Sequence, residues 1–300
     1  MKQIYVIIIG LMLSLPITAQ ITVGTMEPHR MGGGHLQPED IAALKKTTTI
    51  FIVGNESAGD ERKLIEQAFK NSWTITPYKV VSIDDGAEYK DKEGYSVFSY
   101  KKEDYAYSSG RYYYIMKLHY YQLTCKVGKH KKTFANIEMN EKNDSETNFP
   151  NTLQPGYLQC YLKIVNNYLV KNKVLETGKI ISNDEALKNL KTETLYVPEY
   201  LLPEPSKKNG KKEEKDPKEK MMAKYEYPYE FKTGKELSDM ILKDDKGISF
   251  FVYIGITGSS MGWVCVFNSK LDEIVFSDTI MMGFDAAAFK NLGYRISTRH

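Results

Sequence analysis

The chain is poor in cysteine and has no strong charge of either sign. Only Cys125, Cys160 and Cys265 occur among its 300 residues, and no Cys-x-x-Cys pair is present. This spacing excludes a small disulfide scaffold, so we expect three free, buried thiols. The formal net charge is +3, from 41 Lys and Arg residues against 38 Asp and Glu residues. Such a balance argues against a nucleic-acid-binding protein and against an acidic tail.

Long apolar runs are also scarce, and the one present lies at the amino terminus. Lys2 precedes the apolar residues 4–17, and a small-residue processing site ends at Ala19. This order is typical of a secretory signal peptide. The run is too short to cross a bilayer core of about 30 Å, which takes roughly 20 residues. We therefore expect cleavage after Ala19, a periplasmic or secreted protein, and no transmembrane anchor after signal cleavage.

Hydrophobic periodicity predicts strands that alternate with helices. Apolar residues at helical spacing indicate helices, which are expected over 60–72, 157–169, 184–190, 233–242 and 285–292. β-Branched runs and period-two patterns indicate strands, which are expected over 47–53, 77–83, 95–100, 111–126, 133–139, 194–202, 225–232, 248–256, 263–268 and 273–278. The alternation predicts an α/β or α+β fold in which helices flank a mixed β-sheet.

The order of expected elements around Pro77-Tyr78 is similar to the order around Pro228-Tyr229. Two explanations stay open, a duplication or two unrelated β-α-β units. We expect six regions along the chain: a signal peptide (1–19), a flexible leader (20–46), a first half (47–202), a charged linker (203–224), a second half of the same domain or a small second domain (225–292), and a tail (293–300).

A glycine-containing loop at residues 54–59 lies between an expected strand and an expected helix. Backbone N–H groups at such a place often bind phosphate. Here, however, Asp60 and Glu61 stand where a phosphate-binding loop has Lys and then Ser or Thr. The two acids repel phosphate and favour the start of a helix. We therefore expect a structural turn and no nucleotide cofactor.

Residues 258–262 match the Gly-x-Ser-x-Gly pattern of serine hydrolases, with Ser260 as the nucleophile. That motif needs a helix after the serine and Asp and His partners downstream. Instead the strand expected over 263–268 follows, and His300 is the only downstream histidine. A hairpin turn explains the pattern without chemistry. An exported serine hydrolase using Ser260 stays as the alternative to a non-enzymatic function.

Histidine is too thinly spread to predict a metal or acid–base site. Thioether and imidazole ligands suit copper, and four such residues follow the signal peptide: Met26, His29, Met31 and His35. Their spacing is not that of a specific site, so we expect no metal. His119 lies within an expected strand and His130 in a lysine-rich turn, and the sequence gives neither a partner.

Tyrosine is abundant, with 22 residues and a cluster over 105–121. Flat aromatic rings bind sugars and peptides, although tyrosine also favours strands for packing alone. The candidate ligand-binding residues are Tyr112, Tyr114, Tyr120 and Tyr121. The leading hypothesis is an exported bacterial envelope protein that acts as a non-enzymatic binding or assembly module. Its candidate partners are an envelope protein, a peptide or a glycan, with no nucleic acid and no cofactor.

Overall fold

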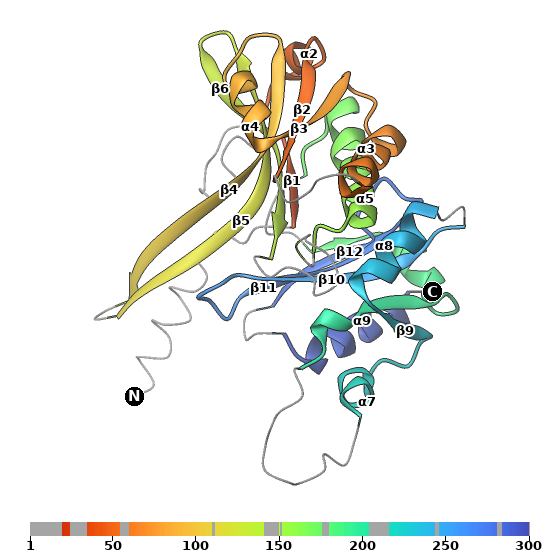
Figure 1. Ribbon diagram of the computed structural model, residues 1–300. Coiled ribbons are helices and arrows are strands. Elements are labelled where there is room, and N and C mark those ends of the chain that lie inside the picture. Colours follow the sequence, from red (N-terminus) through yellow and green to blue (C-terminus); the bar gives the residue numbers. More distant parts are fainter. Residues whose placement is uncertain are drawn as a thin grey trace.

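The computed structural model describes residues 20–24, 35–54, 60–109, 112–140, 150, 152–175, 180–203, 216–243, 246–280 and 284–299, with the backbone alone for 105–109 and 112–114. These residues form two mixed six-stranded sheets with flanking helices, an α+β fold (Figure 1). The predicted fold class is confirmed, with two sheets in place of one. Among the described helices, none is both long enough and apolar enough to span a membrane.

The first sheet has the strand order β1-β6-β5-β4-β2-β3. Its strands are β1 (Ile21–Val23), β2 (Thr48–Val53), β3 (Tyr78–Ser82), β4 (Tyr95–Ser109), β5 (Tyr112–Val127) and β6 (His130–Met139). β2 pairs in parallel with β3 and β4, and the other pairings are antiparallel. The helices of this unit are α2 (Pro38–Leu44), α3 (Asp60–Ser72), α4 (Ile83–Gly86), the 3-10 helix η1 (Ala87–Tyr89) and α5 (Pro155–Val170).

The second sheet has the order β7-β12-β11-β10-β8-β9. Its strands are β7 (Ile181–Ser182), β8 (Leu195–Pro198), β9 (Tyr229–Lys232), β10 (Ser249–Gly255), β11 (Gly262–Asn268) and β12 (Phe276–Ile280). The helices of this unit are α6 (Asp184–Asn189), the 3-10 helix η2 (Glu199–Leu201), α7 (Pro217–Met222), α8 (Gly234–Lys243) and α9 (Ala286–Ser297).

The two units repeat one topology. β8 pairs in parallel with β9 and β10, as β2 does with β3 and β4. Individual hydrogen bonds recur as well: Thr49 N donates to Pro77 O at 2.8 Å, and Leu195 N donates to Pro228 O at 3.0 Å. The structure is therefore consistent with two related halves, and the Pro-Tyr pairs that suggest this in the sequence hold equivalent places.

Helix α5 lies between the two sheets and packs on both. The Tyr157 ring stacks on Phe250 of β10, with ring centroids 5.0 Å apart. Toward the first sheet, Asn71 of α3 donates to the Gln159 side chain at 2.8 Å. One hydrophobic core joins residues of both sheets through this helix. Helices α6, α7 and α9 cover the opposite face of the second sheet, so sheet, helices, sheet and helices form successive layers (Figure 1).

Within the expected flexible leader over 20–46, described residues form two regular elements. Ile21–Val23 is strand β1, fully buried at the edge of the first sheet, and Pro38–Leu44 is helix α2. β1 is too short to show a period-two pattern, and its pairing partner Ile137 is distant in the chain. Local periodicity therefore gives no sign of it.

The boundary between the halves also differs from the one expected. It lies between α5 and β7, so the strand at Leu195–Pro198 belongs to the second unit and not to a first half ending at 202. In the expected linker 203–224, Pro217–Met222 forms α7, and Met221 and Met222 are buried in the second core.

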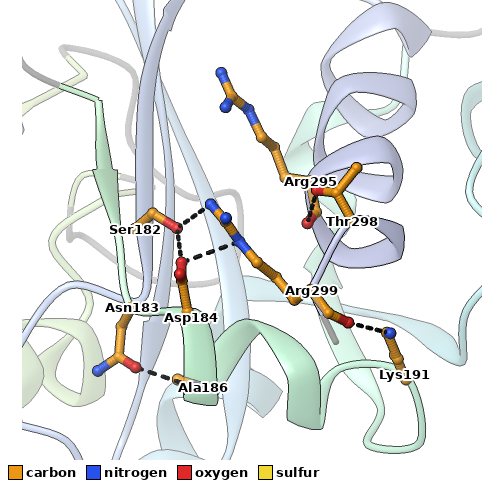
Figure 2. Close-up of polar contacts among 8 residues, drawn as sticks. All are labelled: Ser182, Asn183, Asp184, Ala186, Lys191, Arg295, Thr298 and Arg299. Carbon is orange, nitrogen blue, oxygen red and sulfur yellow. Dashed lines mark hydrogen bonds and ion pairs between the residues drawn. The ribbon is translucent and has the colours of Figure 1, made fainter.

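Hydrogen bonds and an ion pair of Arg299 hold the carboxyl end of the described chain against the start of the second unit. The Arg299 guanidinium donates to Ser182 Oγ at 3.1 Å and lies 3.0 Å from an Asp184 carboxylate oxygen. The Arg299 carbonyl accepts a hydrogen bond from Lys191 Nζ at 2.5 Å, and these contacts converge in Figure 2. Helix α9 thus continues into the expected tail 293–300, whose residue Arg299 is part of the fold.

Candidate functional site

The hairpin of β4 and β5 projects beyond the rest of the first sheet (Figure 1). The two strands pair as far as Ser109 and Tyr112, whereas β2 accompanies β4 only to Phe98 and β6 accompanies β5 only from His119. We call the projecting part the arm; it comprises residues 104–109 and 112–117. Such a two-stranded ribbon presents backbone groups along its outer edges, where another strand can pair.

The base of the arm carries both charged and apolar side chains. Asp104 lies opposite Lys117 in the register, and Ile115 is 55% exposed. Charges on an edge strand disfavour uncontrolled pairing with other edges. The arm thus combines strand edges with charged and apolar side chains at its base.

Of the four predicted ligand-binding tyrosines, two lie in the arm and two in the body of the sheet. Tyr112 and Tyr114 are paired with Ser109 and Tyr107, and their side chains lie outside the described atoms. Tyr120 is only 1% exposed. The half-buried Tyr121 ring stacks on Phe51, with centroids 4.9 Å apart and an interplanar angle of 13°. Tyr120 and Tyr121 therefore do not form one exposed face, because Tyr120 is buried and successive strand residues point to opposite faces.

The turn between β10 and β11 contacts the base of the arm. Lys117 N donates to Thr257 O at 2.9 Å. Gly258 has φ +83, and a Cβ there would lie 2.1 Å from Ile115 O, so this contact requires glycine. Ser260 is exposed in the same turn, with β11 directly after it. The hairpin turn predicted at 258–262 is confirmed, and a strand stands where a serine-hydrolase motif needs a helix.

His119 has a partner that the sequence does not indicate. Its Nδ1 lies 2.5 Å from the hydroxyl of Tyr100, and the direction of the hydrogen bond depends on the tautomer. His119 is 3% exposed and Tyr100 is 46% exposed. This contact between neighbouring strands becomes visible only when the register of β4 and β5 is known. His130 is exposed at the start of β6, and His300 lies outside the described residues.

The glycine loop and the candidate copper ligands are only partly described. Residues 55–59 of the loop, and Met26, His29 and Met31, lie outside the described ranges, and His35 is exposed. Asp60 opens α3 and pairs with Lys63 at 2.8 Å. Within the described part of the chain, no group of three His, Cys, Asp or Glu side chains could hold a metal ion.

The three thiols are buried and form no disulfide, as expected; all three lie in the described part of the chain. Burial raises the pKa of Cys125 to about 11 and that of Cys265 to about 12. Because the thiolate is the reactive form, the raised pKa values lower the reactivity of Cys125 and Cys265 near neutral pH. All three thiols pack in the hydrophobic core that the two sheets share.

Comparisons of this chain with family models, with curated proteins and with solved structures found no match.

Proposed function

We propose that this chain is an exported bacterial envelope protein that binds an extended segment of an envelope partner along the arm. The amino-terminal pattern from Lys2 to Ala19 supports the export. The binding is non-enzymatic, and the hairpin turn at Ser260 supports this because a nucleophilic serine needs a different backbone there. The partner class is a protein or peptide of the periplasm or the cell surface.

One observation carries the proposal: at residues 104–109, β4 has a strand on one side only among the described residues. The backbone N–H and C=O groups of an edge can pair with an incoming strand, which supplies affinity through main-chain hydrogen bonds. Side chains at alternate positions, such as the exposed Ile115 on the partner strand β5, then supply selectivity. The hydrogen bond from Lys117 N to Thr257 O links the base of the arm to the turn between β10 and β11.

The test shortens the arm and keeps the pair of Asp104 and Lys117 at its base. Residues 105–116 are replaced by Asn-Gly, which closes a two-residue turn between Asp104 and Lys117, a directly opposite pair. Lys117 keeps its hydrogen bond to Thr257. We expect the parent protein, beginning at Gln20, to sediment with envelope fractions of its native host. The shortened variant should bind about tenfold more weakly, or about 1.4 kcal/mol, with an unchanged melting temperature.

The Ser260→Ala variant is the matched control, because it alters the adjoining turn and leaves the arm intact. It should bind as the parent does. Equal binding by the shortened variant would contradict a role for the arm. Intact-mass measurement of protein recovered from the host should also show loss of the residues before Gln20, and recovery of the full-length chain from the cytoplasm would contradict the export.

A further inference from the structure

The repeated topology gives positions of the first sheet an equivalent in the second. The pair Val97 and Thr124, across β4 and β5, corresponds to the pair Phe250 and Phe267, across β10 and β11. This follows because β4 lies beside β2 at the same register at which β10 lies beside β8. The face of the first sheet that carries Val97 is thus equivalent to the face of the second sheet that carries Phe250.

In the second sheet this face holds a helix. Tyr157 of α5 stacks on Phe250, and Tyr161 packs on Phe267 with ring centroids 5.2 Å apart. Lys163 Nζ of the same helix donates to the carbonyl of Ser269 at 2.6 Å. A helix from one unit is therefore seated on the sheet of the next.

Part of the equivalent face in the first sheet is polar and bears lysines, whereas Val97 and Tyr120 on the same face are buried. The counterparts of Val252, Ile254 and Ser269 are Ser99, Lys101 and Lys126. The segment of α4 and η1 covers a neighbouring apolar part of this face, around Val97. Beside this segment is a hollow whose lining includes the residues that we call the lysine face: Lys90, Ser99, Lys101, Thr124, Lys126 and Lys131.

The charge on the lysine face is only partly balanced. Of its four lysines, Lys131 alone forms an ion pair within the described residues, with Asp91 at 2.8 Å. Asp91 is also the one acidic residue in the lining of the hollow. A polar outer face on the last unit of a repeat array keeps that unit soluble without any partner. An excess of positive charge on such a face also attracts a partner of negative charge.

We propose that the lysine face binds an acidic helix of a partner protein, seated on the first sheet as α5 is seated on the second. The occupied equivalent face shows that a helix fits on a sheet of this topology beside its covering segment. Because the lysines are positively charged, they favour a helix with negatively charged side chains. This surface is separate from the arm and does not depend on the function proposed for it.

The test measures fluorescence anisotropy of a labelled, glutamate-rich amphipathic helical peptide with the mature protein at low and high salt. We expect binding that weakens as salt rises. The double variant Lys101→Glu, Lys126→Glu should weaken binding at least about tenfold. A matched variant, Lys188→Glu with Lys290→Glu, changes two exposed lysines on α6 and α9 by the same charge and should bind within about twofold of the parent.

Three results would overturn the proposal: no binding of the peptide, an equal loss in both double variants, or tighter binding of inorganic polyphosphate that shows the same dependence on Lys101 and Lys126. The last would indicate a general polyanion site. The milder variant Lys101→Gln, Lys126→Gln, with its melting temperature measured, keeps the comparison decisive if the glutamate variant fails to fold.

Discussion

At Glu138 a carboxyl group is enclosed in the first sheet. The residue is 1% exposed and lies opposite Tyr120 of β5. Burial and, after it, the charge of Glu103 raise the pKa of Glu138 well above its ordinary value. The folded protein therefore favours the neutral form, because a charge in a poorly solvated site costs free energy.

We expect Glu138→Gln to stabilise the protein at pH 7 relative to the parent. Since the folded pKa lies above the unfolded value of about 4.3, the favourable contribution of Glu138 is complete below that value. It is lost as the pH rises toward the folded pKa. The free energy of unfolding of the variant, relative to that of the parent, should therefore rise by on the order of 1 kcal/mol from pH 4 to pH 7. Urea unfolding of both proteins at the two pH values measures this change. An unchanged difference between the two proteins would contradict the raised pKa.

At the scale of elements, the approach of α5 to α8 depends on one glycine. Gly156 N donates to Ser238 Oγ at 2.9 Å, and a Cβ at position 156 would lie 2.5 Å from Ser238 O. The two helices therefore touch through their backbones. Any larger side chain has to push α8 away from α5.

We expect Gly156→Ala to destabilise the protein by about 1–3 kcal/mol, the usual cost of overpacking. The control is Gly293→Ala in α9, where a Cβ would make an ordinary contact of 3.4 Å with Lys224 O. That variant should be neutral or more stable by up to about 1 kcal/mol, since alanine favours helices. Denaturant midpoints measure both changes. A neutral Gly156→Ala would show that α8 moves without cost.

Elements with a strong local signal are the ones that sequence predicts well. The helix expected over 60–72 is observed at those bounds, because its apolar stripe is regular. β4 extends past its expected end at Tyr100. The prediction ends there because the charged residues that follow break the alternation that marks a strand. The contact of Tyr100 with His119 could not be predicted, because it depends on the register between two strands. The arm itself is invisible in the sequence, which does not show where neighbouring strands stop.

At the scale of the whole molecule, the two units share a hydrophobic core. Tyr157 and Tyr161 are fully buried in the intact chain, partly beneath residues of the second sheet. A unit cut out alone would expose that face of α5 to water. Its stability would fall with the apolar area that is lost from the core.

We therefore expect the fragment 20–175 to lack cooperative unfolding and to bind a hydrophobic dye, whereas the chain from Gln20 onward should unfold in a single transition. Circular dichroism during heating and dye fluorescence measure both properties. The fragment 180–300, which lacks α5, should behave in the same way. A fragment that melts as sharply as the whole chain, without binding dye, would contradict the shared core.

The pairing of β1 with β6 sets the time at which the first sheet can close. Ile21 lies opposite Ile137, so most of the first unit has to be synthesised before the two strands meet. Closing so long a loop costs conformational entropy before the strand pairing contributes any favourable free energy, and this slows folding. During synthesis from the amino terminus, β1 is made long before β6 and stays unpaired with it until β6 is made. The pairing that completes the first sheet therefore involves the first strand of that sheet to be synthesised.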